Sequence, residues 1–391
     1  MRIAVMMEQS RPGGPDSMIS DLINHWPERD SFIIYINESH KEEMKSRGDF
    51  SGKNIEIKTI PGFSRGTVRR RYSSALPSSV LHVIAECLFL PMLVFSIIRQ
   101  YSLLKSDGVD QTIVNNGGYP GGDLCIAAVI ASKMAGLSPL LIIHNLPAEY
   151  RYKRIEKFLD YIVDRSADIV SVSKKSAHEL STHRNISQSI TVIYNGISKQ
   201  RISQSDKSVG CDGDNPIVLM IANLEERKGH YYLFNALSKM AFPIDIILIG
   251  DGTPDEVEEI QTLISEFDNG NVEFHQYVDT VGEYYAKADV FVLPSVRNES
   301  LPMTIIEAFS YELPVVASDV GGIRELIEDR ANGMLVEPGN SDNLRDAINY
   351  VLKENANNDM SLKARKTYRD KFTIERMVKE YHNLIYKDRD Q

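Results

Sequence analysis

The chain has few cysteines and no long hydrophobic run, and these two absences narrow its class. Its three cysteines, Cys87, Cys125 and Cys211, are far apart and form no paired metal-binding motif. A disulfide framework is therefore excluded as the basis of the fold, and a reducing compartment is expected. The longest uncharged stretch, residues 87–98, falls well short of the roughly 18 apolar residues that cross a bilayer. No membrane-spanning helix is predicted.

Basic residues are also fewer than acidic ones. The chain has 44 Lys and Arg against 54 Asp and Glu, a formal net charge of −10. Nucleic-acid binding needs concentrated Lys and Arg, so nucleic acid is excluded as a main partner. Glu8 interrupts the opening apolar run too early for a signal peptide. The protein is expected in the cytoplasm, with at most a peripheral contact at the inner face of a membrane.

Short apolar runs alternate with helical patterns along almost all of the 391 residues, enough for two domains with a core each. Near-continuous apolar runs are typical of parallel strands covered by helices on both faces. The alternation predicts an α/β protein of two doubly wound, Rossmann-like parallel-sheet domains. The predicted strands are residues 3–7, 32–36, 111–114, 140–143, 169–172 and 191–193, then 217–222, 244–249, 290–293, 315–317 and 334–336.

A polar, glycine-containing stretch separates the two halves. Residues 198–215 show no apolar periodicity and are interpreted as a linker. The first domain is expected over residues 1–197 and the second over 198–370. In the remaining segment, 371–391, the spacing predicts an amphipathic helix over Phe372–Tyr386, whose apolar face needs a surface to cover.

The strongest candidate site follows a predicted strand of the second half. Glu299 lies in the loop after the strand, and Glu307 lies about one turn into the next helix. Pro302 suits the first turn of that helix, which leaves the N–H groups of Met303 and Thr304 free to bind an anion. Carboxylates on either side of such a helix start suit the hydroxyls of a sugar and a ribose around a diphosphate. Taken alone, two glutamates are more often solvated surface charges.

Three further loops of the second half lie at strand ends, where doubly wound sheets bind ligands. Lys228 stands beside Gly229 and can reach a phosphate as a point charge. Gly250 begins a tight turn at another strand tip, and Gly321-Gly322 precedes a further helix. Each is compatible with an ordinary turn, but their shared position favours one site.

In the first half, two features occupy comparable positions. Gly13-Gly14 follows the first predicted strand, with a simple loop as the alternative. His144 follows the strand at residues 140–143, although a lone histidine is more often structural. A metal site is not expected, because the one Asp-x-Asp pattern, Asp212-Gly213-Asp214, lies in the linker and suits a turn.

Two features of the first half concern an acceptor or a surface. Arg65–Arg71 holds four arginines in seven residues. It is interpreted either as a mobile solvated loop or as a segment attracted to anionic lipid headgroups or a lipid-phosphate acceptor. Leu81–Ile98 is strongly apolar and predicts a core helix kinked at Pro91, with a membrane-contacting face as the alternative.

Four stretches of the second half resemble the family 4 retaining glycosyltransferases of the GT-B fold: Ala222–His230, Ile249–Gly252, Ala288–Ala308 and Leu313–Leu326. The glutamates within Pro-Ser…Glu-Ser-Leu-Pro…Glu-Ala are the most specific element. The resemblance implies that the two domains face each other across a cleft and that the last helix crosses back onto the N-terminal domain.

The activity that the resemblance implies is retaining transfer of a hexosyl unit from a nucleotide-diphosphate sugar to an acceptor. The donor is expected to be UDP- or GDP-linked, and the acceptor a glycan or a lipid-linked glycan. Neither a metal nor another cofactor is expected. The setting would be the synthesis of cell-surface polysaccharide or glycolipid.

The resemblance also assigns roles. Glu299 matches the residue that binds the hydroxyls of the donor sugar, and Glu307 the one that binds the ribose. Lys228 matches the basic residue on the diphosphate, and His144 a histidine that faces the sugar. Backbone amides from Leu301 to Thr304 would bind the sugar and the diphosphate.

Gly13-Gly14 matches a loop near the phosphates in these enzymes, and Gly250 lies within a matching stretch. Asn223 departs from the pattern, since the family has an arginine there. Arg227 or Arg297 could replace that arginine. The departure keeps open a catalytically impaired protein that binds sugar nucleotides. A dinucleotide-dependent oxidoreductase is disfavoured, because no Gly-x-Gly-x-x-Gly is complete.

Overall fold

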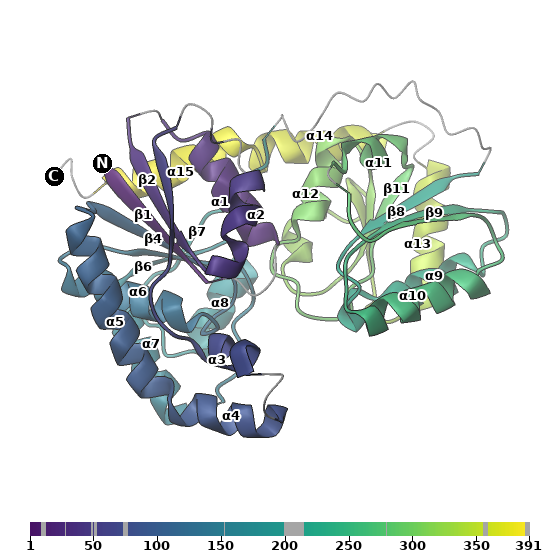
Figure 1. Ribbon diagram of the computed structural model, residues 1–391. Coiled ribbons are helices and arrows are strands. Elements are labelled where there is room, and N and C mark those ends of the chain that lie inside the picture. The colour runs from purple at the N-terminus through teal and green to yellow at the C-terminus, as the bar shows by residue number, and fades with distance from the viewer. Residues whose placement is uncertain are drawn as a thin grey trace. The chain divides into compact units, whose positions relative to one another are not determined.

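The computed structural model describes residues 1–8, 13–27, 29–47, 50, 53–72, 77–151, 153–198, 215–278, 280–354 and 359–387. Contacts divide the chain into two compact units. Unit 1 comprises Met1–Tyr194 and Met377–Gln391, and unit 2 comprises Asn195–Arg376. Each is built on one parallel sheet with helices around it (Figure 1), which confirms the predicted fold class. The predicted domain limits at residues 197 and 370 stay predictions.

The sheet of unit 1 has the strand order β3-β2-β1-β4-β5-β6-β7. Its central strands are buried almost throughout, as their continuous apolar sequences require. The order reverses direction between β1 and β4, and doubly wound sheets bind ligands beside the carboxyl ends of the strands at such a reversal. The strands are β1 Arg2–Met7, β2 Ser31–Ile36, β3 Ile55–Thr59, β4 Gln111–Asn116, β5 Leu140–Ile143, β6 Asp168–Ser171 and β7 Thr191–Val192.

The helices of unit 1 cover both faces of its sheet. Right-handed crossovers place α1 and α2 on one face and α5, α6 and α7 on the other (Figure 1). The helices are α1 Gly14–Asn24, α2 Lys41–Arg47, α3 Arg65–Tyr72, α4 Ser78–Cys87, α5 Phe89–Ser106, α6 Asp123–Met134, α7 Lys153–Ser166 and α8 Lys174–His183, with a short 3₁₀ turn, η1, at Glu38–His40.

Unit 2 repeats the plan with the order β10-β9-β8-β11-β12-β13 and a reversal between β8 and β11. Its strands are β8 Ile217–Ile221, β9 Asp245–Ile249, β10 Val272–His275, β11 Val290–Leu293, β12 Val315–Ser318 and β13 Gly333–Val336. Its helices are α9 His230–Leu237, α10 Pro254–Glu266, α11 Gly282–Lys287, α12 Met303–Ser310, α13 Ser341–Glu354 and α14 Asp359–Lys371, with 3₁₀ turns η2 at Glu226–Lys228 and η3 at Ile323–Glu325.

The predicted amphipathic helix near the C-terminus is α15, Ile374–Tyr386. From Met377 onward the chain belongs to unit 1, where the apolar side of the helix is buried. Near the end of α15, the Tyr386 hydroxyl donates to Asp30 at 2.7 Å, and the same carboxylate accepts the Trp26 indole N–H at 2.8 Å. The end of α15 is thereby fixed to the body of unit 1.

The apolar segment Leu81–Ile98 differs from its prediction. It is not one core helix: α4 ends at Cys87, α5 begins at Phe89, and their axes bend by 59°. Pro91 is not the kink, because it lies in the first turn of α5, where a missing N–H breaks no hydrogen bond. Within the described residues no single helix is long and apolar enough to cross a membrane, and α4 with α5 is the one bent pair that passes this test together.

The arginine-rich segment also differs, because Arg65–Tyr72 forms helix α3 instead of a loop. Arg65 pairs with Asp123 at 2.6 Å and with Glu86 at 3.1 Å, and Arg69 pairs with Glu86 at 3.0 Å. These two arginines are therefore neutralised within unit 1. The side chains of the other two lie outside the described part of the chain.

Candidate functional site

Glu299 lies just after β11 in unit 2 and gathers three donors on one oxygen. Its side chain is buried, and its Oε1 accepts from the Ser295 hydroxyl at 2.7 Å and from Lys228 Nζ at 2.6 Å. Arg227 Nη1 lies 3.4 Å from the same oxygen. The structure thus brings together a predicted sugar-binding carboxylate and two predicted phosphate-binding cations. Ser295 was not singled out as a site residue, although it lies in the quoted Pro-Ser motif.

Backbone packing brings the two cations to this carboxylate. Gly229, directly after η2, has a left-handed φ of 81°, and a Cβ there would lie 2.1 Å from the carbonyl oxygen of Pro294. The Val296 N–H donates to the Arg227 carbonyl at 2.8 Å. A side chain at position 229 would therefore separate the cation-bearing turn from the loop that carries Glu299.

A second glycine fixes the backbone of Glu299 itself. Gly321, after β12, has a φ of +57°, and a Cβ on it would lie 1.7 Å from the Glu299 carbonyl oxygen. The next N–H, that of Gly322, donates to this oxygen at 3.0 Å. The first glycine of the Gly-Gly pair noted in the sequence is thus explained by close backbone approach.

Asn223 does not supply the positive charge of the expected arginine, but it helps to position Arg227 through a hydrogen bond to Glu225. Burial alone would raise the pKa of Glu225, but the charge and hydrogen bond of Arg227, the charge of Lys228 and a hydrogen bond from Asn223 hold that pKa below its usual value. Glu225 accepts from Arg227 Nε at 2.5 Å. Of the two candidate substitutes, Arg227 is therefore at the site, whereas Arg297 is exposed and lies 3.6 Å from Glu226.

Helix α12 begins at Met303, one position later than predicted. Pro302 is its N-cap, so the first helical residues are Met303 and Thr304. No side chain among the described residues caps this end. Its first N–H groups therefore offer partial positive charge to an anion. Leu301, just before, is buried in the core of unit 2 and anchors the approach to the helix.

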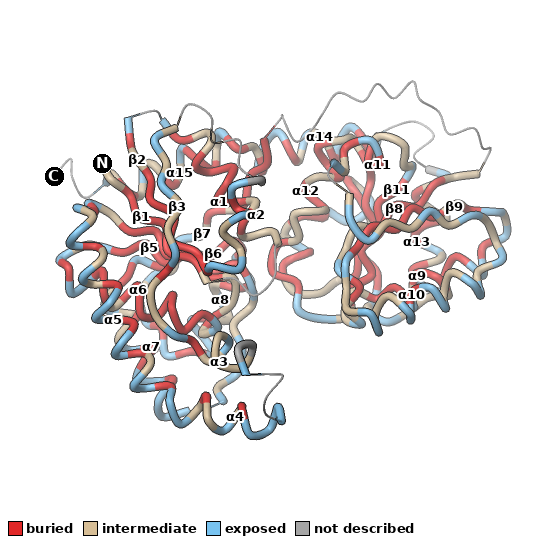
Figure 2. The backbone as a smooth tube through the Cα atoms, viewed as in Figure 1, coloured by how far each residue is buried: buried red, intermediate tan, exposed pale blue. Residues whose placement is uncertain are grey.

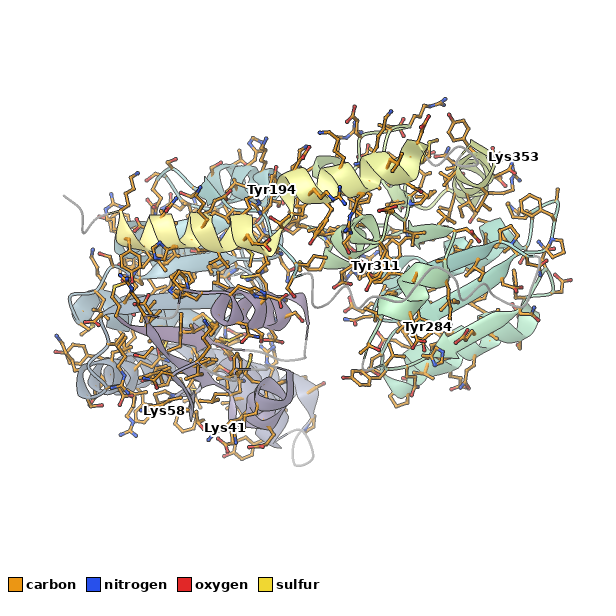
Figure 3. All side chains as sticks on the ribbon, turned by 90° about the horizontal axis from the view of Figure 1, so that it is seen from above. Lys41, Lys58, Tyr194, Tyr284, Tyr311 and Lys353 are labelled. Atoms are coloured by element: carbon orange, nitrogen blue, oxygen red, sulfur yellow. The ribbon has the colours of Figure 1, made fainter. Side chains whose placement is uncertain are left out.

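Glu307 lies on the first turns of α12 and is half-buried. Its Oε2 accepts a hydrogen bond from the Tyr285 hydroxyl at 2.9 Å. The Tyr285 ring stacks on Tyr311, which is labelled in Figure 3, with centroids 5.4 Å apart. Tyr285 thus holds one oxygen of the carboxylate. No sequence motif points to this tyrosine, which comes from α11.

Gly250 lies where the ends of β8 and β9 come together. A Cβ at Gly250 would lie 1.9 Å from the Ala222 carbonyl oxygen. The Leu224 N–H donates to the Asp251 carbonyl at 3.0 Å, which joins the two loops. Glycine is needed at this position because the backbones approach too closely for a side chain.

In unit 1 the predicted residues also meet at strand ends. Gly13 is the N-cap of α1 and Gly14 its first residue, and the Gly13 N–H donates to Asp16 at 3.0 Å. His144 Nε2 lies 2.6 Å from Asn115 Oδ1, and Asn115 Nδ2 donates to the carbonyl of Pro15 at 3.3 Å. Asn115, at the end of β4, connects the two predicted features and was not identified from the sequence.

The environment of His144 determines its protonation. The ring is buried, and burial lowers its pKa to about 3. The imidazole is therefore neutral from mildly acidic to basic pH. It is suited to donate or accept a hydrogen bond, but not to act as a base with a pKa near 7.

The described residues contain no group of three or more His, Cys, Asp or Glu side chains placed to hold a metal ion. The Asp212–Asp214 pattern lies outside the described residues. Metal independence stays a prediction, as does the cleft between the two domains.

Known proteins match a large part of this chain. The family model described as glycosyl transferases group 1 matches residues 202–367, and the resemblance is confirmed for this segment. The chain is 30% identical over 236 residues to the uncharacterized glycosyltransferase MJ1607 of Methanocaldococcus jannaschii, covering 57% of this chain and 60% of the relative. It is 26% identical over 242 residues to the N-acetyl-alpha-D-glucosaminyl L-malate synthase of Bacillus anthracis, covering 59% and 62%. The chain thus spans less than two thirds of the length of either relative.

Solved structures match almost the whole chain. A glycosyltransferase from Rickettsia africae ESF-5 superposes with a TM-score of 0.77 at 18% identity, covering 99% of this chain and 98% of that one. Anabaena Alr3699/HepE, in complex with UDP-glucose, superposes with a TM-score of 0.73 at 20% identity, covering 99% and 100%. At these identities the match shows the fold, that of GT-B glycosyltransferases.

Proposed function

We propose that this chain, whose residues 202–367 match glycosyl transferases group 1, transfers a sugar from a nucleotide-diphosphate donor bound at the strand ends of unit 2. The observation that carries the proposal is the convergence of Lys228 and Arg227 on Glu299. An enzyme that releases a nucleoside diphosphate needs positive charge where the leaving group develops its negative charge, next to a group that binds sugar hydroxyls.

Each part of the site has a task in this proposal. Glu299 binds hydroxyls of the donor sugar, and Glu307, which Tyr285 positions, binds the ribose. Lys228 and Arg227 bind the diphosphate together with the N–H groups at the start of α12. The departure of this chain from the family arginine at Asn223 is compensated by Arg227, which Glu225 orients.

The chemistry proposed is retention at the anomeric carbon without a divalent metal. The cations and the N-terminus of α12 supply the positive potential that a metal provides in other transferases. Retention rests on the family resemblance. His144 would act in unit 1 as a neutral hydrogen-bonding group toward the donor sugar, since its low pKa leaves it uncharged.

The donor is proposed to be a UDP- or GDP-linked hexose and the acceptor a glycan or lipid-linked glycan in cell-surface polysaccharide or glycolipid synthesis. HepE bound to UDP-glucose supports the donor class. A relative titled lipopolysaccharide core biosynthesis glycosyltransferase LpsE, of Rhizobium meliloti, supports the acceptor class.

A panel of UDP-, GDP- and ADP-sugars tests the proposal, with donor hydrolysis and transfer measured with and without a chelator. We expect one nucleotide series to be turned over at the same rate in the chelator, with a retained product by proton NMR. An inverted product, or activity abolished by the chelator and restored by manganese, would contradict the mechanism. Tight donor binding without turnover would favour the catalytically impaired alternative.

Replacing Glu307 should weaken nucleotide binding. Its hydrogen bonds to ribose hydroxyls are charge-assisted, and such bonds contribute about 1.5–3 kcal/mol. Glu307→Ala is therefore expected to lower affinity for the nucleoside diphosphate roughly 10- to 150-fold by calorimetry, at tenfold per 1.4 kcal/mol. Glu283→Ala, an exposed carboxylate of the same unit, is the matched control. Unchanged affinity in Glu307→Ala would remove this residue from the site.

A further inference from the structure

Exposed apolar side chains are concentrated on one part of unit 1. Of sixteen large hydrophobic residues that are exposed in the described chain, eight lie on or beside α4 and α5. Figure 2 shows exposed positions along the outer side of both helices. The eight are Phe63, Val80, Val83, Leu88, Leu90, Val94, Phe95 and Ile98. Scattered apolar residues are normal on a surface, but a contiguous group marks a site of interaction.

Helix α5 is apolar on both sides. Its inner side, with Leu93 and Leu104, is buried in the core of unit 1. Its outer side carries Val94, Phe95 and Ile98, of which Ile98 is 58% exposed. Packing within unit 1 therefore explains why the inner side of α5 is apolar, but not why the outer side is.

Helix α7 adds a second apolar row and a group of positive charges. Ile155, Phe158 and Tyr161 follow one another at helical spacing and are exposed, Phe158 by 62%. The exposed basic residues in and just before this helix are Arg151, Lys153, Arg154, Lys157 and Arg165. This part of the surface is thus basic in a chain of net charge −10.

Two of the three carboxylates of α7 do not neutralise that charge. Glu156 and Asp160 point inward, and each pairs at 3.0 Å with Arg184, whose side chain is fully buried. The two acids are therefore already matched inside unit 1. The third carboxylate, Asp164, accepts from the Ser187 and Gln188 N–H groups and lies next to Arg165 in the sequence. Lys153, Arg154 and Lys157, at the other end of α7, therefore keep most of their field.

The two surfaces are neighbours. Helix α6 packs against both α5 and α7, and Arg151, just before α7, contacts His82 of α4. In Figure 1, α4, α5 and α7 lie together on the side of unit 1 away from α1 and α2. We call the exposed residues of α4, α5 and α7 named above the apolar–basic face.

We propose that the apolar–basic face docks onto the surface of an anionic lipid bilayer. An interfacial helix buries apolar and aromatic residues at the level of the headgroups, while lysines and arginines bind anionic lipid. The basic residues that do this are those of α7. Arg65 and Arg69 of the arginine-rich segment are paired with Glu86 and Asp123 instead.

The charge of the face argues against a second copy of the chain as its occupant. A two-fold dimer buries the same patch on both partners. That arrangement would place the α7 lysines and arginines of one copy close to those of the other. Anionic lipid offers the opposite sign together with an apolar interior.

The test is flotation of the full chain with vesicles of phosphatidylcholine alone and of phosphatidylcholine mixed with phosphatidylglycerol. We expect stronger binding to the mixed vesicles. Because each basic residue near such a surface contributes about 1 kcal/mol, Arg154→Gln with Lys157→Gln should lower binding to the mixed vesicles about 25-fold. Val94→Gln with Ile98→Gln should lower binding to both kinds of vesicle.

Lys41→Gln with Lys45→Gln is the matched control, since it removes the same charge from α2 on the opposite face of the sheet. An equal loss in this control, or no binding to the mixed vesicles, would overturn the proposal. The proposal would also be overturned if sedimentation experiments showed a dimer and the Val94 and Ile98 changes dissociated it. Donor hydrolysis in solution does not involve this face, so failure here and failure of the proposed function are separate results.

Discussion

Lys228→Met is expected to lower turnover about 10²- to 10³-fold while weakening donor binding much less, the loss typical of removing one group that stabilises developing negative charge. Negative charge on the diphosphate grows as the glycosidic bond breaks. A cation beside it therefore stabilises the transition state more than the bound donor. In the free protein Lys228 lies 2.6 Å from Glu299, within a site that is largely shielded from water.

The measurement is kcat and KM for the preferred donor, with nucleoside diphosphate affinity by calorimetry. Lys287→Met is the matched control, because it removes a lysine near Glu283 at 3.9 Å in the same unit. An equal fall in kcat for both variants would point to a general loss of stability. A rise in KM with unchanged kcat would mean that Lys228 contributes to binding alone.

The strands that the sequence did not predict share one physical property. β3 and β10 are the edge strands on the β2 and β9 sides of their sheets, and neither is fully buried. Their sequences, Ile-Glu-Ile-Lys-Thr and Val-Glu-Phe-His, alternate apolar and polar residues. Continuous apolar runs identify parallel strands that are covered on both faces, so a search for such runs misses strands that alternate apolar and polar residues.

Part of the candidate site was predictable because its residues directly follow strands that the sequence reveals. Glu299, Lys228 and the start of α12 follow recognisable strands, and sequence order alone assigns them to strand ends. Tyr285 and Asn115 hold Glu307 and His144 from other elements of the fold. No local pattern distinguishes such partners from other tyrosines and asparagines, because the contact is created by tertiary packing. The bend at Leu88 was missed because Pro91 is the more obvious break in sequence.

Glu299→Gln is expected to lower transfer by about 10²-fold or more and to leave nucleoside diphosphate affinity within about threefold. Glutamine is nearly isosteric and keeps a carbonyl oxygen that can accept from Ser295 and Lys228, so the local structure should persist. What is lost is the negative charge and one pair of acceptor sites for sugar hydroxyls. Diphosphate affinity should not fall, because the carboxylate no longer competes for the two cations.

A double-mutant cycle with Lys228→Met separates the two roles that the geometry allows for Glu299. If the carboxylate acts only by positioning Lys228, then Glu299→Gln will have no further effect on transfer once the lysine is absent. If it binds the sugar, as we propose, a substantial loss will remain in the Lys228→Met background. Two results together would contradict a role in sugar binding. Glu299→Gln would have no effect in the Lys228→Met background, and diphosphate affinity would fall in the single variant Glu299→Gln. Glu299 would then belong to the group that binds the diphosphate.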